Sequence, residues 1–470
     1  MRALERSPRS EKIFSIFCSV DTMVSVADKF ARLSALRPVR GFPSRLPDLR
    51  LPDETDPISH LLGGGIARNQ YGEHLAIRNW FSTPEFAPPA ANALELLTRT
   101  LDANMSARTR AALADPERWL FLDTETTGLS GGTGTYAFLV GLAWWDSGGL
   151  QVEQLFLRDL HEEYSLLQEL SARLAERPVL VTFNGKTFDW PLLENRFTMT
   201  RKIHAPKLAA HLDLLHPARA LWKLRLGTVR LVELERYVMD PARLGWRRED
   251  DVPSSMIPQF YFDYLRGGSG QPLAGVVRHN QMDLRGLAAL FGKINDLLES
   301  REDAFAGTDS LDLFGLSKFL HRKGEKDRAH SACSFALNAG LPAELRPKAR
   351  RELAQMAKKR GEHERAALLL HELVVNPEET LFACEQLAMH YERHARDLAR
   401  AIEFAQLGVK TLQRQLNHSR DPYASARLNR LQQKFMCRLE RLRHRMKNAG
   451  AAAAAPLLTQ EPAVPSAEHR

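Results

Sequence analysis

Cysteine is scarce in this chain of 470 residues, and the four that occur, Cys18, Cys333, Cys384 and Cys437, stand far apart. There is no CxxC pair and no cluster of histidines, so a zinc site or a disulfide framework is not expected. Scattered single cysteines are typical of a reducing compartment, and they predict a cytoplasmic location.

Long apolar runs are also missing. No stretch of 18 apolar residues occurs, which predicts no membrane span and no membrane partner. The short apolar piece IFSIFCSV is preceded by Glu11 and Lys12, and no small-residue cleavage site follows closely, so we predict no signal peptide. The formal charge of +8 is modest for this length and favours a nucleic-acid partner only weakly.

Composition divides the chain into five parts. Residues 1–60 are rich in Arg, Pro and Ser and are expected to be irregular. Residues 61–114 hold a short extension with one possible strand, GEHLAIRNWF, followed by a linker. Residues 115–300 have the pattern of an α/β domain, and residues 308–447 are helical. Residues 448–470 are expected to form a disordered tail.

The 115–300 range alternates short apolar runs with amphipathic segments. WLFLDTET, TYAFLVGLAWWD, GLQVEQLFLRD and PVLVTFNG predict four strands. EEYSLLQELSARLAE, FDWPLLENRF, HLDLLHPARALWK and VVRHNQMDLRGLAALFGKINDLL predict helices. This order indicates a mixed sheet flanked by helices.

The helical range carries a weak repeat. GEKDRAHSACSFAL, from Gly324, resembles GEHERAALLLHELV, from Gly361, and Ala401 follows Ala366 by a similar interval. Such spacing predicts TPR-like helical hairpins, with an irregular helical bundle as the alternative. Residues 420–447 are strongly basic and are interpreted as either a solvated helix face or a nucleic-acid contact.

Two acids close the first predicted strand. Asp123 and Glu125 are two residues apart in a strand, so their side chains point to the same face. Like charges so close repel each other unless a cation compensates them. Hard divalent metals bound by carboxylate oxygens do this well, although a strand-end turn with solvated acids is an equally good interpretation of the pair by itself.

Three further residues join this pair. Asp189 follows a strand in FNGKTFD, and Asp283 and His279 lie one helical turn apart in HNQMD. By themselves they fit a helix cap and a solvated helix face. Together the four acids suit phosphodiester hydrolysis by two metal ions, with the histidine taking the proton of the attacking water, because an ordinary imidazole titrates near neutral pH.

The segments DTETTGL, FNGKTFDWPLL and HNQMDLRGL, in this order, resemble the three motifs of the DEDD superfamily of 3′→5′ exonucleases, which has a ribonuclease H-like fold. The chain is more closely similar to the YprB-type ribonuclease H-like domain, through GGTGTYAFLVG, PSSMIPQFYFDYLR and VVRHNQMD among other segments. The resemblance covers about residues 115–300, and the TPR-like helices also fit longer bacterial members of this group.

The resemblance implies two Mg²⁺ (or Mn²⁺) ions. Asp123 would bridge both ions, Glu125 would bind one of them beside the terminal nucleotide, and Asp189 and Asp283 would complete the two sites. His279 would be the general base. His279 stands four residues before Asp283. In family members whose catalytic residue at this place is a tyrosine, the tyrosine is four residues before the last Asp; where it is a histidine, the histidine is five residues before.

Weaker expectations concern the substrate. Thr124, Asn184 and Gly185 lie in or beside the motifs and are candidates for nucleotide contact, as is the GGTG loop at 131–134. Arg219 and Lys223 are candidate phosphate contacts. For two further residues we favour a structural interpretation over a functional one. Trp222 is expected to lie in the core, and Asp213 is expected to have a structural or outer-sphere role.

The resemblance implies hydrolysis of single-stranded nucleic acid from the 3′ end. DNA, in repair or processing, is favoured because YprB-like proteins resemble partners of helicases, and the TPR-like repeats would then bind such a protein. RNA 3′-end trimming is the alternative, because hydrolysis of the phosphodiester makes no use of the sugar. A non-catalytic nucleic-acid-binding scaffold and an endonuclease on the same fold are further hypotheses.

Overall fold

The structure is a computed structural model. Residues 1–56 of the region predicted to be irregular lie outside the described residues. The same holds for most of the linker, for residues 131–133 of the GGTG loop and for the tail beyond 453. The residues described are 57–82, 97–98, 106–128, 134–146, 148–239, 244–246, 248, 251–300, 302–418 and 420–453.

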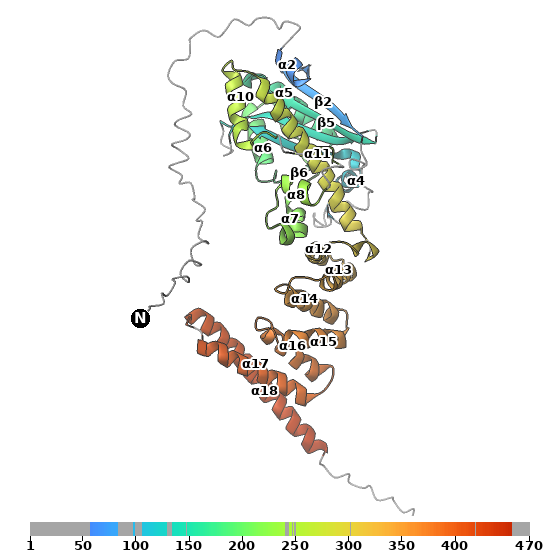
Figure 1. The fold of residues 1–470 in the computed structure, drawn as a ribbon, viewed down its shortest axis with the longest axis vertical. Helices are drawn as coiled ribbons and strands as arrows, with labels where there is room; N and C mark the ends of the chain where they lie inside the picture. Colours follow the sequence, from blue (N-terminus) through green and yellow to red (C-terminus); the bar gives the residue numbers. More distant parts are fainter. Residues whose placement is uncertain are drawn as a thin grey trace, which may run out of the picture. The chain divides into compact units, whose positions relative to one another are not determined.

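Seven strands form one mixed sheet in the described part of the chain, in the order β1-β2-β5-β4-β3-β6-β7 (Figure 1). β3, β6 and β7 are parallel, and the other neighbours are antiparallel. The expected strand GEHLAIRNWF is present as β2, so the sheet includes residues that precede 115. The strands are β1 Gly65–Asn69, β2 Gly72–Phe81, β3 Trp119–Thr126, β4 Ala137–Asp146, β5 Gly149–Phe156, β6 Val179–Thr182 and β7 Ala210–Asp213.

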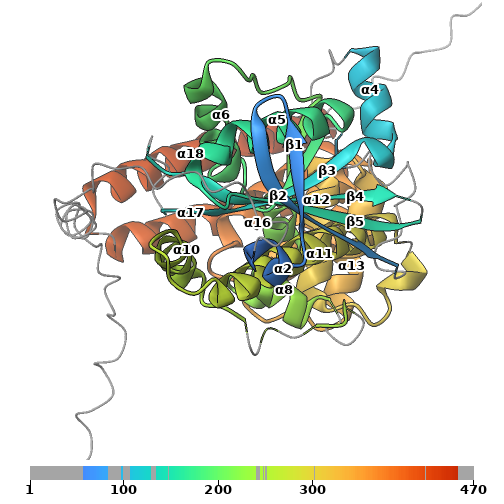
Figure 2. The same ribbon diagram turned by 90° about the horizontal axis from the view of Figure 1, so that it is seen from above.

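Helices cover both faces of this sheet. Figure 2 shows α5 (Glu163–Glu176) and α6 (Asp189–Thr200) on one side, and α10 (Ile257–Leu265) and α11 (Gln271–Glu299) on the other. The expected α/β fold with a mixed sheet is therefore confirmed. The remaining helices are α2 Pro57–Leu62, α4 Ala107–Ala114, α7 Leu215–Leu226, α8 Leu231–Tyr237, α12 Ser310–Arg322, α13 Lys326–Asn338, α14 Arg346–Lys359, α15 His363–Leu373, α16 Thr380–Arg393, α17 Leu398–His418 and α18 Pro422–Ala453.

The central strand β3 shows why the sheet is buried on both faces. Trp119 and Phe121 belong to one apolar core, whereas Leu120 and Leu122 belong to another. Neighbouring side chains of a strand point to opposite faces, so a run of four apolar residues fills both cores. The acids that follow in β3 are therefore held at the end of a strand that packing fixes on both sides.

One of the predicted helices is wrong in part. HLDLLHPARALWK was interpreted as a helix throughout, but its first residues belong to β7, which ends at Asp213, and α7 begins at Leu215. β7 pairs in parallel with β6, from Val179 opposite Ala210 to Thr182 opposite Asp213. A strand of four residues is too short for its own periodicity to show, and only the hydrogen bonds to β6 define it.

A helix-rich region follows the sheet domain, as predicted. Its helices pack in chain order, α12 with α13, α14 with α15, α16 with α17, and α17 with α18. The TPR-like assignment of these hairpins stays a prediction. The basic stretch forms α18, which continues through Ala453 into the range expected to be a disordered tail. None of the described helices has the length and apolarity needed to cross a membrane.

Gly141 of β4 allows α11 to lie close to the sheet. A Cβ atom at this position would overlap the Asn280 side chain and lie 2.8 Å from Leu284 Cδ1. Both neighbours are buried, so they have little room to move.

We expect Gly141→Ala to lower the free energy of unfolding by about 1–3 kcal/mol, because overpacking forces shifts in a filled core. Urea denaturation followed by circular dichroism measures it. Gly65→Ala is the matched control, since Gly65 is also a strand glycine but has nothing within 4 Å of its Cβ position. Equal stability of the two variants would contradict the close packing.

Candidate active site

The carboxyl ends of the three parallel strands bring the predicted acids to one edge of the sheet. Asp123 and Glu125 lie at the end of β3, and Asp189 opens α6 just after β6. Asp213 ends β7, next to β6. In open α/β sheets, this edge is where ligands bind.

Asp123 and Glu125 are buried among other acids. Burial, and then the charges of Asp283 and Asp189, raise the pKa of both carboxyls well above their ordinary values. The carboxyls of Asp123 and Glu125 are therefore both within electrostatic reach of the acids from the other two motifs. Removing like charges from water costs free energy, which protons, cations and hydrogen-bond donors offset.

Thr124 connects the first two motifs. Its side chain points away from the acid pair because strand residues alternate, and its hydroxyl donates to Asp189 Oδ1 at 2.5 Å. Burial raises the pKa of Asp189, and the Thr124 bond opposes that rise by stabilising the carboxylate. Thr124 therefore orients a candidate metal ligand. Its predicted contact with the nucleotide stays a prediction.

The third motif lies on α11, where Asn280 contacts the first acid. Asn280 is completely buried and donates from Nδ2 to Asp123 Oδ2 at 2.8 Å. Its own Oδ1 accepts from Gln154 Nε2 at 2.9 Å, and this second bond fixes the orientation of the amide. Asp123 is thus held by a chain of amides that runs back to β5.

His279 is oriented by an acid outside the three motifs. Its Nδ1 lies 2.8 Å from both carboxylate oxygens of Asp251. Its Nε2 points into the acid cluster, 3.5 Å from Asp283 Oδ2 and 4.0 Å from Glu125 Oε1. A carboxylate on Nδ1 favours the tautomer that carries the proton there, which leaves Nε2 as an acceptor.

Arg248 supplies positive charge to the same cluster. Its guanidinium lies 2.5 Å from Asp283, 2.6 Å from Glu235 and 3.1 Å from Asp251. Burial opposes the charged form, but the Glu235 bond and the Asp283 charge raise the pKa of Arg248 further above its already high value. Gly286 provides the space for Glu235, because a Cβ there would overlap that carboxylate.

The donor set fits divalent cations. One oxygen or nitrogen from each of Glu125, His279 and Asp283 lies within 4.8 Å of the other two, close enough to share an ion. Carboxylate oxygens are the ligands of Mg²⁺ and Mn²⁺, and buried acids with raised pKa values gain most from such an ion. Asp123 and Asp189 are outside that closest group. Asp123 nevertheless interacts electrostatically with Glu125 and with Asp189.

The remaining candidates divide between the site and its surroundings. Asn184 has a left-handed backbone, with φ of 68°, and Gly185 has no space for a Cβ beside Thr182. Asp213 accepts the backbone N–H of Asn184 at 2.7 Å, which supports a structural role. Trp222 is buried in the core. The two predicted phosphate contacts are exposed on α7, away from the acids: Arg219 and Lys223.

Sequence reasoning missed four residues of this site: Asp251, Arg248, Glu235 and Asn280. Asn280 lies inside the HNQMD motif, and its neighbours could have indicated it. Glu235 lies in LVELER, a segment that also resembles the YprB-type domain, but Arg248 and Asp251 belong to no motif. These three residues precede Asp283 by 32 to 48 positions, so no local pattern showed that they meet there.

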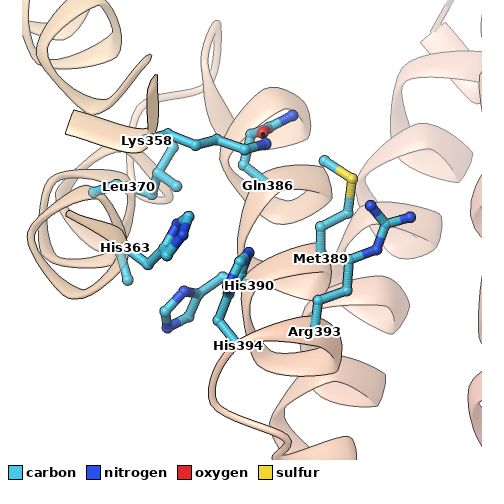
Figure 3. A pocket seen from close by; sticks show the side chains of 10 residues that line it. Lys358, His363, Leu370, Gln386, Met389, His390, Arg393 and His394 are labelled. Carbon is cyan, nitrogen blue, oxygen red and sulfur yellow. Dashed lines mark hydrogen bonds between the residues drawn. The ribbon is translucent and has the colours of Figure 1, made fainter. Parts of the chain in front are cut away.

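A second group of titratable side chains occurs in the helical region. Figure 3 shows His363, His390 and His394 around a hollow that Lys358 and Arg393 also line. The His363 and His394 rings stack with centroids 3.6 Å apart. The described residues place no three ligand atoms here as close as in the acid cluster, and the two cationic side chains disfavour a metal. This hollow is not a candidate catalytic centre.

Comparison with known proteins agrees with the fold. Residues 120–295 match the RNase_H superfamily. The chain is also similar to the uncharacterized protein YprB of Bacillus subtilis (strain 168), with 30% identity over 316 residues, which are 66% of this chain and 74% of that protein. Residues 120–295 are therefore a domain of the RNase_H superfamily, and the chain belongs to the same family as YprB.

The acid cluster predicts a specific pH dependence of stability. Raised pKa values mean that the folded, metal-free protein keeps protons that the unfolded chain releases above the ordinary values of 3.8 for Asp and 4.5 for Glu. The free energy of unfolding then falls as pH rises from those values through the raised ones. We expect the melting temperature in EDTA to fall over this range, and Mg²⁺ or Mn²⁺ to restore it most at the high-pH end.

Thermal unfolding of wild type, Asp123→Asn and Glu403→Gln across pH, with and without metal, measures this effect. Asp123→Asn removes one buried charge and should flatten the curve in EDTA. Glu403 is exposed on α17 and serves as the control. Parallel curves for wild type and Asp123→Asn would contradict the mutual repulsion.

Proposed function

We propose that this protein is a DEDD-type, metal-dependent 3′→5′ exonuclease that acts on single-stranded nucleic acid, with DNA as the favoured substrate. The single observation that carries the proposal is the His279 imidazole, which Asp251 holds on one side while its other nitrogen faces Glu125 and Asp283. An oriented base beside paired acids is the arrangement that hydrolysis of a phosphodiester requires.

The acids have the binding role in this proposal. Asp123, Glu125, Asp189 and Asp283 would hold two divalent ions, which bind the scissile phosphate, lower the pKa of the attacking water and stabilise the leaving oxygen. Asn280 keeps the Asp123 carboxylate oriented, and Thr124 does the same for Asp189. Ligands fixed before the substrate arrives need no reorganisation during the reaction.

His279 has the proton-transfer role. The Asp251 carboxylate accepts from Nδ1, so Nε2 is free to take a proton from a water placed between the histidine and the acids. The imidazolium that forms is stabilised by the same carboxylate, as in other histidine–carboxylate pairs. The four-residue spacing to Asp283 is compatible with this role, because one turn of α11 puts both side chains on the same face.

The sugar preference rests on the resemblance to YprB-like proteins rather than on the site. RNA is the alternative substrate, and the assay below includes it. The non-catalytic alternative is disfavoured because all four acids of the three motifs meet at one edge of the sheet.

We expect the protein to release mononucleotides from 3′-labelled single-stranded DNA in Mg²⁺ or Mn²⁺, and to stop when a chelator is added. Asp123→Ala and Asp283→Ala should reduce the rate to that of the chelated protein, because each removes a metal ligand. Denaturing gels with 3′- and 5′-labelled DNA and RNA give direction, product size and sugar preference.

Glu403→Ala is the control for general damage to the chain. Full activity in Asp123→Ala or Asp283→Ala would overturn the proposal, and products longer than a mononucleotide would change it to an endonuclease. Faster release from RNA would replace DNA with RNA as the substrate.

His279→Ala should lower kcat by about 10²–10⁴-fold, the usual contribution of a general base. Asp251→Asn should lower it by about 10–100-fold, because an amide keeps the shape but no longer fixes the tautomer. Calorimetric titration with Mn²⁺ should give nearly unchanged affinity for both variants. Loss of metal affinity without loss of kcat at saturating metal would make His279 a ligand instead of the base.

A further inference from the structure

Two hollows lie along α7 where it meets α12, with volumes of about 310 and 760 Å³. Ala220 of α7 and Arg322 of α12 line both of them, so the hollows form one continuous depression. We name it the α7–α12 groove. Its basic lining residues are Lys186, Arg219, Lys223, Lys318, Arg322 and Lys323.

The groove has a strong excess of positive charge. Only two acids, Asp213 and Glu352, line it beside those six Lys and Arg residues. The Asp213 carboxylate is buried and occupied by backbone N–H groups, including that of Lys186 at 3.2 Å. Glu352 is 3.9 Å from Lys318, and burial raises its pKa, which favours its neutral form.

Four of the cations have no acid to pair with. Lys186, Arg219, Lys223 and Arg322 are exposed, and within the described ranges no carboxylate lies at ion-pair distance from any of them. The pKa of nearby His321 is lowered by burial and by two more lysines of the helical region, which shows how far the positive field extends. Such a field attracts and steers a polyanion.

One end of the groove is formed by segments that adjoin the candidate active site. Lys186 lies in the β6–α6 loop, three residues before Asp189, and Asp213 ends β7 at the same edge of the sheet. From there the lining follows α7, with His216, Ala220 and Lys223 on one stripe of the helix. The far end is formed by α12 and α14, in the helical region.

The two walls of the groove are held together by close packing. A Cβ at Gly315 of α12 would overlap the carbonyl oxygen of Leu221 in α7, so the two helices touch there. Arg225 binds Asp312 through Nε, at 2.8 and 2.9 Å from the two oxygens. Trp222 and Phe314 belong to one core. The groove is thus a fixed surface of the folded chain.

We propose that the α7–α12 groove binds the sugar–phosphate backbone of a single-stranded nucleic acid, on the 5′ side of the nucleotide in the active site. The helical region would then be part of the nucleic-acid interface. This inference rests on the proposed function for the direction of the strand. The lining contains no Trp or Tyr, and its one Phe, Phe319, is buried, whereas its Lys and Arg residues outnumber its three histidines, so the main contacts are to phosphates and independent of sequence.

The test is equilibrium binding of a fluorescent dT oligonucleotide of 20 residues in EDTA, at several salt concentrations. Lys223→Gln with Arg322→Gln removes one cation from each wall. We expect the slope of log K against log salt to become shallower by about 1.4, since each lost phosphate contact on a single strand contributes about 0.7. Arg322→Gln by itself should give half of this change and shows whether α12 takes part.

Lys410→Gln with Arg414→Gln is the matched control, because it removes the same charge from exposed positions of α17. An equal change of slope in this control, or none in the groove variant, would overturn the inference. Polyglutamate that competes as well as the oligonucleotide, and loses affinity equally in the groove variant, would instead assign the groove to an acidic protein.

The binding assay needs no catalysis, so the two proposals fail separately. Binding that depends on the groove, without hydrolysis, would keep this inference and refute the exonuclease. Hydrolysis with unchanged binding and unchanged KM in the groove variant would keep the exonuclease and refute this inference.

Discussion

Four partly buried acids crowd together at the sheet edge, and their need for positive charge is the constraint on which the rest of this structure depends. Asp123 and Glu125 sit where β3 ends between two apolar cores, and Asp189 and Asp283 face them. Water cannot solvate such a set fully, so its members are either protonated, paired or bound to cations. The raised pKa values of Asp123, Glu125 and Asp189, and the neighbours that surround the acids, both follow from this one requirement.

The neighbours of the acids answer that requirement in different ways. Arg248 neutralises part of the charge directly, through Asp283. Asn280 and Thr124 donate hydrogen bonds, which stabilise carboxylates without adding charge. His279 contributes a nitrogen whose orientation Asp251 sets. A metal ion at Asp283 would share that carboxylate with Arg248, so the loop that carries Arg248 belongs to the site electrostatically.

The helical region and the sheet domain form one packed body around α7. That helix follows β7, whose last residue anchors the β6–α6 loop, and its outer side packs on α12. The same helix therefore connects the candidate active site with a basic surface on the helical region. If this surface binds nucleic acid as proposed, the C-terminal helices take part in holding the substrate.

The α/β class, the strands β3 to β6, the long helix α11 and the candidate acids could be predicted from the sequence. These follow from local patterns: apolar runs fill two-sided strands, and Asp123 and Glu125 share a face because side chains alternate. In contrast, β7 exists through its bonds to β6, and the contacts of Asp251, Arg248 and Glu235 are defined by the fold alone. Those residues lie far along the chain from the acids they contact, and no local periodicity records a long-range contact. The groove between α7 and α12 is of the same kind, because its charges come from segments that meet only in the fold.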